Sequence, residues 1–195
     1  MKNIYIILIL IFSFTIISCA KKSDTSSTTT TTEVEGTWLT NCFQSGDYYH
    51  IHSATVTGTD VVVKYEWHTD SGCSTDYVMW EDTYDSLSIG DEITFSDGTK
   101  GHQFTLNIVN LKLTPQIASA VSSLNTDNSC GYSDWALNTA KDYTGKNCSS
   151  TAYPVANTSI QGLYNLVGNN LFIGTLNTTG SYPTEVSTTI TYVKQ

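Results

Sequence analysis

The chain has 195 residues, of which 39% are hydrophobic and 14% are charged, and 18 acidic against nine basic residues give a formal net charge of −9. All of the basic residues are lysines. An acidic chain without arginine lacks the basic surface that nucleic acids and anionic lipid headgroups require, which argues against both as binding partners. The simplest interpretation of the net negative charge is that the protein is soluble and has an acidic surface.

The N-terminus has the pattern of a bacterial lipoprotein signal. Lys2 precedes the apolar run Ile4–Ile17, whose length of about 14 residues is too short to span a membrane. Ser18 then precedes Cys19, where such a signal is cut and the cysteine is lipidated. We interpret residues 1–18 as a signal peptide and Cys19 as the anchored residue. The alternative is an ordinary secretory signal with an incidental cysteine.

The next segment, residues 19–32, is rich in Ser and Thr and has nothing apolar to bury, so we expect a flexible tether to the membrane. Ala20 stands where an aspartate would indicate retention in the inner membrane, which favours the outer membrane. Loss of the signal leaves 8 lysines against 18 acidic residues, a formal charge of −10. Residues 33–195 are enough for one compact domain.

The chain has five cysteines, and an odd number in an exported protein requires an explanation. Assigning Cys19 to the lipid leaves four, which an oxidising compartment would join as two disulfides. We expect Cys42 with Cys73 and Cys130 with Cys148, although four cysteines allow three connectivities and the sequence excludes none. Zinc is a weaker alternative, because no Cys-x2-Cys pair is present and no histidines cluster beside the cysteines.

Short runs of β-branched and aromatic residues, separated by Gly, Asn, Asp and Ser, predict a mainly antiparallel sheet. The pair Gly58-Thr59 fits a two-residue type II′ turn between Tyr49–Thr57 and Asp60–His68, because glycine comes first. In this register, alternate residues of both strands share one face. They are His50, His52, Ala54, Val56, Val61, Val63, Tyr65 and Trp67.

A Gly-Asn pair at residues 168–169 predicts a second hairpin, in which Leu166 opposes Leu171 and Tyr164 opposes Ile173. Further strands bring the expected number to about eight. They are Gly36–Phe43, Thr75–Tyr84, Glu92–Ser96, His102–Thr114 and Ser187–Lys194.

The strand His102–Thr114 changes the parity of its apolar residues near Asn107–Asn110. Either a bulge turns the inward side there, or the strand is covered on both faces. Two short helices are expected after this strand, Pro115–Leu124 and Asp134–Thr144. The second would end at Gly145 in a left-handed conformation.

Several motifs resemble a known family. The residues Gly36-Thr37-Trp38, Cys42, Tyr65, Asp70 and Cys73 resemble the opening of lipocalin-like domains, of the APCDD1 type and of uncharacterised bacterial lipoproteins. The same lipoproteins carry stretches similar to Cys130–Asn138 and to Tyr164, Gly174, Pro183, Thr184 and Tyr192–Lys194. The resemblance implies an antiparallel up-and-down β-barrel whose interior can hold one small apolar ligand. It transfers no catalytic residues.

Candidate ligand-binding residues lie on the inward face of the first hairpin. His52, Val63, Tyr65 and Trp67 would line a cavity, with polar tips that orient a ligand in an apolar wall. The alternative is that these aromatic residues fill the core of a small barrel.

The histidines also suggest a metal site, because His50 and His52 point the same way on a strand. In the register of the Gly58-Thr59 turn, however, His68 opposes Tyr49 and faces away from them, so we predict no metal. The acidic residues lack the spacing of a calcium loop, and no nucleophile with a base or phosphate-binding glycine loop is present. We therefore predict neither a cofactor nor an enzyme.

Together these features predict a lipid-anchored envelope protein whose barrel binds a small apolar or amphipathic ligand. The alternative is a filled barrel that acts as a surface adhesin or an envelope interaction module. A cavity lined by the residues above would favour the first, and an exposed apolar patch without a cavity the second. No specific protein partner is predicted.

Overall fold

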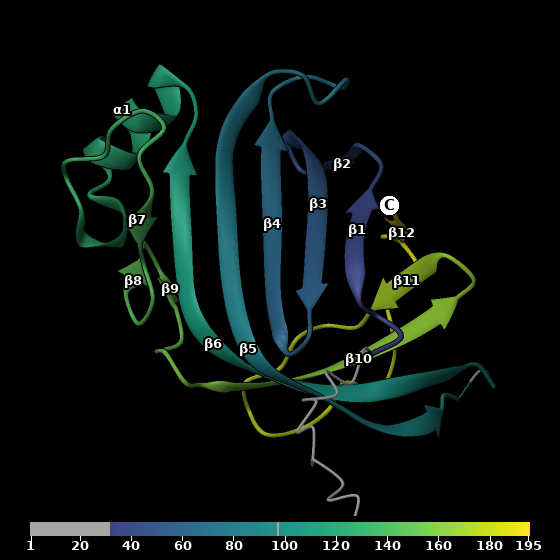
Figure 1. The fold of residues 1–195 in the computed structure, drawn as a ribbon. Helices are drawn as coiled ribbons and strands as arrows, with labels where there is room; N and C mark the ends of the chain where they lie inside the picture. Colours follow the sequence, from purple (N-terminus) through teal and green to yellow (C-terminus); the bar gives the residue numbers. More distant parts are fainter. Residues whose placement is uncertain (1–31, 97) are drawn as a thin grey trace, which may run out of the picture.

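A computed structural model describes residues 32–96 and 98–195 (Figure 1). The predicted signal peptide, Cys19 and residues 19–31 of the predicted tether lie outside this part of the chain. Among the residues described, no helix is long and apolar enough to cross a membrane.

Eight antiparallel strands close into a barrel, in which strands that follow one another in the chain lie side by side (Figure 1). Closure is completed by β1, which pairs with β12 on one side and β3 on the other. The predicted up-and-down barrel is therefore confirmed. The barrel strands are β1 (Gly36–Thr40), β3 (Tyr48–Thr57), β4 (Asp60–His68), β5 (Asp76–Thr94), β6 (Lys100–Pro115), β10 (Ser159–Val167), β11 (Asn170–Ile173) and β12 (Tyr192–Lys194).

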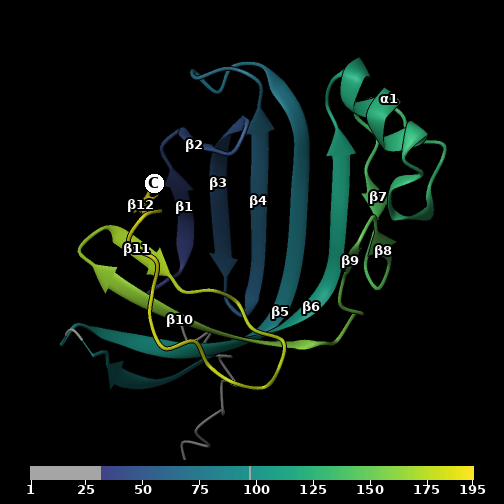
Figure 2. The ribbon, with the colours of Figure 1, turned by 180° about the vertical axis from the view of Figure 1, so that it is seen from behind.

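The remaining elements add to this barrel without entering its closed order. The short strand β2 (Phe43–Ser45) pairs with the start of β3. A segment inserted between β6 and β10 lies beside the C-terminal half of β6 in both ribbon views (Figures 1 and 2). It contains α1 (Ala118–Thr126), a 3-10 turn (Ser129–Gly131), β7 (Lys141–Asp142), β8 (Asn147–Cys148) and β9 (Thr151–Ala152).

Both predicted hairpins have the predicted register. Thr57 opposes Asp60 across a turn in which Gly58 has φ of 61°. In the second hairpin Leu166 opposes Leu171, and Gly168 at the turn also has φ of 61°. Glycine takes this left-handed conformation at no steric cost, which is why it fixes each turn and hence each register.

The parity change in β6 is produced by a bulge. Thr83 pairs with Asn110, but its neighbour Tyr84 pairs with Ile108, so Val109 has no partner on β5 and is 39% exposed. The extra residue lets apolar side chains of both parities face the core. These are Phe104, Leu106, Ile108, Leu111 and Leu113, all buried.

Four predicted strands have clearly different limits in the structure. The predicted strands Thr75–Tyr84 and Glu92–Ser96 are parts of one strand, β5, which continues through polar residues by irregular pairing with β6. The predicted strand Gly36–Phe43 breaks after Thr40 and resumes as β2. Of the predicted strand Ser187–Lys194, only Tyr192–Lys194 forms a strand, β12, which pairs with β1 and β11.

The first predicted helix is present with a later start. Pro115 ends β6, Ile117 is still extended with φ of −137° and ψ of 152°, and α1 begins at Ala118. The bulky, β-branched Ile117 thus belongs to the strand exit rather than to the first helical turn.

The second predicted helix, Asp134–Thr144, is wrong. Lys141–Asp142 instead pairs with the edge of β6 that β10 leaves free, and Asn138 has a left-handed φ of 55°. The backbone N–H of Trp135 donates to Asn125 Oδ1 at 2.6 Å. These bonds replace those of a helix. Gly145 does take the predicted left-handed conformation, with φ of 69°, but in a turn between short strands.

Both expected cysteine pairs are joined as disulfides. Cys42–Cys73 links the end of β1 to the loop between β4 and β5, with Cα atoms 6.0 Å apart. Cys130–Cys148 links the 3-10 turn to β8, with Cα atoms 3.9 Å apart. The first therefore fastens one end of the barrel, and the second closes the inserted segment on itself.

Candidate ligand-binding cavity

The hairpin of β3 and β4 turns one face into the barrel. His50 opposes Trp67, His52 opposes Tyr65 and Ala54 opposes Val63. Opposed residues of an antiparallel pair point to the same side of the sheet, so these side chains form one continuous inner wall.

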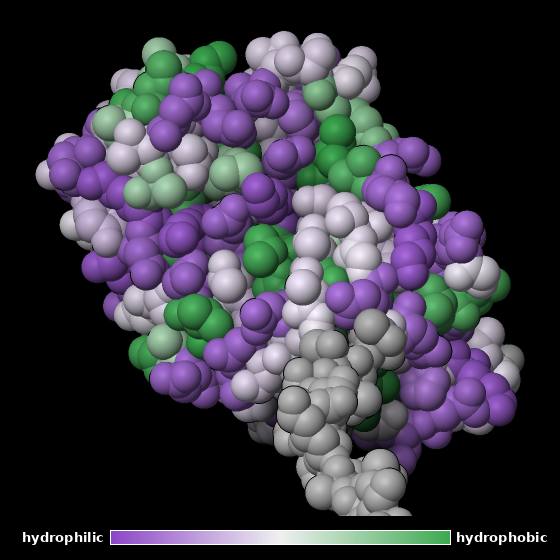
Figure 3. Space-filling model, viewed as in Figure 1, coloured by the Kyte–Doolittle hydropathy of each residue, from purple (hydrophilic) through white to green (hydrophobic). Residues whose placement is uncertain are grey.

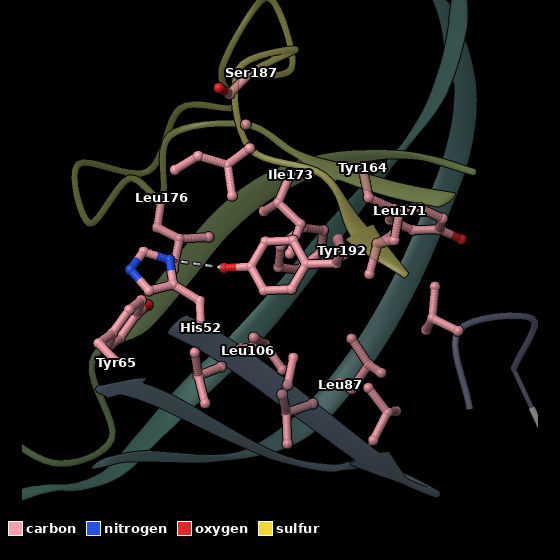
Figure 4. A pocket seen from close by; sticks show the side chains of 18 residues that line it. His52, Tyr65, Leu87, Leu106, Tyr164, Leu171, Ile173, Leu176, Ser187 and Tyr192 are labelled. Carbon is pink, nitrogen blue, oxygen red and sulfur yellow. Dashed lines mark hydrogen bonds between the residues drawn. The ribbon is translucent and has the colours of Figure 1, made fainter. Parts of the chain in front are cut away.

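A cavity of about 250 Å³ lies inside the barrel (Figure 4). We call it the aliphatic cavity, because most of its lining side chains are Val, Leu, Ile or Ala. None of the described residues that line it is Asp, Glu, Lys or Arg. They are Val34, His52, Ala54, Val56, Val61, Val63, Tyr65, Leu87, Phe104, Leu106, Tyr164, Leu171, Ile173, Gly174, Leu176, Ser187, Ile190 and Tyr192.

The few polar groups of this wall are neutral at neutral pH. The Tyr192 hydroxyl lies 3.4 Å from His52 Nδ1, the interaction drawn as a dashed line in Figure 4. Burial, followed by repulsion from His50, lowers the pKa of His52 to about 4. Burial also raises the pKa of Tyr192 to about 12. The cavity therefore offers hydrogen bonds but no charge.

A second cavity, of about 400 Å³, adjoins the first. We call it the aromatic cavity, because seven of its nine lining residues carry rings. His52, Tyr65 and Ile190 line both cavities and so form the neck between them. The other lining residues are Phe43, Ser45, His50, Trp67, Trp80 and Tyr153.

The structure brings all four predicted ligand-binding residues together around these cavities. His52, Val63 and Tyr65 line the aliphatic cavity, while His52, Tyr65 and Trp67 line the aromatic one. That they bind a ligand stays a prediction. The aliphatic cavity is also lined by three residues of the second predicted hairpin, which the sequence placed on one apolar face. They are Tyr164, Leu171 and Ile173.

A long connection between β11 and β12 supplies wall residues that the sequence did not indicate. We call residues 174–191 the strap; it loops past β10 in Figure 2. Leu176, Ser187 and Ile190 line the cavity from it, and Figure 4 labels Leu176 and Ser187. Asn177 exchanges two backbone hydrogen bonds with Gln161 of β10. A Cβ atom on Gly174 would lie 2.6 Å from the Glu185 carbonyl oxygen, so the strap folds back here only because residue 174 is glycine.

The chain enters the barrel beside the aliphatic cavity. Val34 is 6% exposed and lines the cavity, and its carbonyl accepts a 2.7 Å hydrogen bond from the indole of Trp38. On either side, Glu33 accepts a bond from the Tyr164 hydroxyl at 2.6 Å and Glu35 one from the Gly58 backbone at 3.0 Å. The segment that follows the predicted tether is thus part of the cavity wall.

The histidines lie as the register predicted. His50 and His52 have ring centroids 5.9 Å apart, whereas His68 opposes Tyr49 on the other face of the sheet. His68 is buried, and its Nδ1 is 3.2 Å from an Asp76 oxygen but makes no hydrogen bond at that angle. Within residues 32–96 and 98–195, no three or more His, Cys, Asp or Glu side chains gather as a metal site would require.

An interior carboxylate was not foreseen. Asp82 opposes Val63 and so faces the barrel interior, where it accepts 3.0 Å hydrogen bonds from the hydroxyls of Tyr84 and Tyr143. Burial raises its pKa, and the two phenol bonds partly offset that effect. The group does not line either cavity, so we regard it as a structural polar site.

No model of a known protein family matches this chain, and no curated protein sequence matches it.

Proposed function

We propose that this is a lipid-anchored envelope protein, held at the outer membrane through Cys19, whose lipocalin-like barrel binds a small apolar or amphipathic molecule without catalysing a reaction. The observation that carries the proposal is the uncharged aliphatic cavity inside a closed barrel. The lipoprotein pattern of residues 16–19 supports the location. The motifs shared with lipocalin-like lipoproteins support the family.

The cavity sets a lower limit on the ligand. Each methylene group moved from water into such an apolar space contributes roughly 0.8 kcal/mol. Association costs at least about 4 kcal/mol in lost translational and rotational freedom. A ligand therefore needs more than about five buried methylene equivalents before it binds. Short organic acids and sugars do not meet this requirement, whereas lipid-like molecules do.

The position of the chain entry supports capture near a membrane. Val34 lies in the cavity wall, and the predicted tether between it and Cys19 would reach on the order of 20 Å. The end of the barrel at which the chain enters would then stay close to the bilayer surface, where apolar ligands are concentrated.

The alternative of a surface interaction module has less support. Large exposed hydrophobic residues lie in separate segments of the chain, for example Leu137 and Val155 in connections and Val167 at the end of β10. The face in Figure 3 is largely hydrophilic, with hydrophobic residues in small separate patches. A docking surface would need a larger continuous patch.

Native mass spectrometry of the mature chain, before and after organic extraction and re-addition of a mixed lipid pool, tests ligand binding. Ala54 is buried and lines the aliphatic cavity, whereas its neighbour Thr55 is exposed on the outer face. We expect a bound mass that returns in the wild type and in Thr55→Leu but not in a folded Ala54→Leu variant. A wild-type protein that takes up nothing would refute the proposal.

Membrane fractionation tests the anchor separately. We expect the wild type in the outer-membrane fraction and Cys19→Ala in the soluble envelope fraction or retained with its signal uncut. Equal fractionation of mature wild type and mature variant would show that Cys19 is not the anchor.

A further inference from the structure

We infer that the two cavities form one binding site with chemically different halves, and that its ligand is an uncharged planar ring, bearing a hydrogen-bond acceptor, with an aliphatic tail. The tail occupies the aliphatic cavity and the ring the aromatic cavity. The inference rests on the proposed function and specifies its ligand class.

The two halves adjoin each other. His52, Tyr65 and Ile190 belong to the walls of both cavities, so no further layer of side chains separates them. The aliphatic cavity of about 250 Å³ is small for a site by itself, whereas together with the adjoining cavity of about 400 Å³ it falls within the roughly 300–1,000 Å³ that small-molecule sites span. Ile190 comes from the strap, so one side of the neck is formed by a loop rather than by a barrel strand.

The aromatic cavity is built to contact a flat group. Trp80 has centroid distances of 6.2 Å to both Trp67 and Tyr153, and lies nearly parallel to Tyr153 at 27°. On the adjoining strands β3 and β4, His52 and Tyr65 meet edge to face with centroids 4.8 Å apart. Rings attract other rings in offset or edge-to-face arrangements. A planar ligand finds such partners on several sides of this cavity, whereas a flexible chain gains no more here than in the aliphatic cavity.

Unpaired polar groups specify an acceptor on the ring. Tyr65 makes no side-chain hydrogen bond within the described chain, although its hydroxyl is in the neck. Burial and nearby Asp82 raise the pKa of Tyr65, so it remains a phenol that can donate. Trp80 Nε1 is also buried without a partner. A buried donor without an acceptor is unfavourable, as at Trp80 Nε1, and a ring oxygen or nitrogen at the neck would accept a hydrogen bond from the Tyr65 hydroxyl.

The walls also exclude a fatty-acid anion. Neither cavity has a lysine among its described lining residues, and the chain has no arginine. A carboxylate buried without a cation is strongly disfavoured. His52 cannot supply the charge near neutral pH, because burial holds its pKa at about 4.

Three neutral probes separate the halves: menadione as the ring, 1-decanol as the chain, and menadione carrying a decyl group at its free ring position. Their affinities for the mature wild-type protein can be measured by calorimetry at pH 7.5. We expect the joined probe to bind at least about tenfold more tightly than either piece, since linking two fragments makes the second contact intramolecular. Decanoate should bind more weakly than 1-decanol.

Substitutions then show which cavity binds the ring and which binds the aliphatic tail. Trp67→Leu should weaken menadione more than 1-decanol, and Ala54→Leu should do the reverse. Tyr65→Phe should weaken the binding of menadione and of decyl-menadione, and decyl-menadione should still bind more tightly of the two. Thr55→Leu, on the outer face, is the control. If 1-decanol or decanoate binds as tightly as the joined probe, the ring inference is wrong while the proposed ligand-binding function stands. If the native mass experiment also finds no uptake, the proposed function fails as well.

Discussion

The hydroxyl of Tyr143 donates a 3.0 Å hydrogen bond to Asp82 although 61 residues separate the two along the chain. Tyr143 belongs to the inserted segment and Asp82 to the inner face of β5, so this bond joins the insertion to the barrel interior. It also packs Tyr143 edge to face against Trp80, with centroids 5.2 Å apart. The insertion therefore helps to hold a wall residue of the aromatic cavity.

Removing the Asp82 carboxylate leaves two buried hydroxyls without their acceptor. We expect Asp82→Ala to lower the free energy of unfolding by about 1–3 kcal/mol for the unsatisfied groups. Urea denaturation followed by tyrosine and tryptophan fluorescence would measure this. Asp85→Ala is the control, because Asp85 lies on the same strand but does not accept the hydrogen bonds of Tyr84 and Tyr143. Equal effects of the two substitutions would contradict the assignment.

Asp82 also predicts a pH dependence. Its pKa is raised in the folded state, chiefly by burial, so the folded state binds the proton more tightly than the unfolded one. Stability from this group is greatest below its unfolded pKa near 3.8 and is lost as the pH rises through the raised value. Asp82→Asn removes that titration, so its stability relative to wild type should improve between pH 4.5 and 7.5. A constant difference would show that burial of the charge is unimportant.

For His52 we predict a pH dependence of stability with the opposite sign. Its folded-state pKa of about 4 lies below the ordinary value of 6.5, so the folded state favours the neutral ring. The resulting stability is fully present above pH 6.5 and is lost as the pH falls towards 4. Thermal unfolding of His52→Phe should therefore decline less steeply over that range than the wild type. Parallel curves for the two proteins would contradict the buried, neutral state of His52.

The disulfides should contribute unequally to stability. The Cys42–Cys73 bond encloses a separation of 31 residues and the Cys130–Cys148 bond one of 18. Loop-closure entropy then gives roughly 4 and 3 kcal/mol respectively. Urea denaturation of the two paired Cys→Ser variants would measure these values. A much larger loss for the second pair would mean that its role is mainly to position the insertion.

Gly174 predicts a localised effect on the strap. A Cβ atom there meets the Glu185 carbonyl oxygen at 2.6 Å, whereas one on Gly90 makes ordinary contacts of 3.5 Å or more. We expect Gly174→Ala to cost about 1–3 kcal/mol of stability and to raise hydrogen exchange at strap amides such as Asn177. Gly90→Ala should leave the strap unchanged. Strap exchange that is the same in both variants would refute the close packing.

The hairpins could be predicted because a short local sequence determines the register of each. Gly58 and Gly168 each come first in a two-residue turn, and the period of two then assigns every side chain to a face. This is why His52, Val63, Tyr65 and Trp67 were placed on the inner wall correctly. The bulge at Val109 also left a local trace, as a change in the parity of apolar residues.

Other features depend on contacts that local patterns do not encode. The stretch Asp134–Thr144 has helical spacing, yet the free edge of β6 offers Lys141–Asp142 a strand partner, and that tertiary contact decides the outcome. The chain has strand-forming residues from Ser187 onward, but only Tyr192–Lys194 pairs as a strand with its neighbours β1 and β11. Leu176 and Ile190 then reach the cavity through the path of the strap, which no sequence period indicates.

The strap leads directly into β12, and that three-residue strand is also the one that closes the barrel against β1. One part of the wall of the aliphatic cavity and the closing strand of the barrel therefore belong to one continuous segment of the chain. If the proposed ligand leaves past the strap, its residence time should reflect how often Tyr192–Lys194 separates from its neighbouring strands, because the strap continues into that strand. Dissociation rates would then follow the local opening of this strand rather than the depth of the cavity.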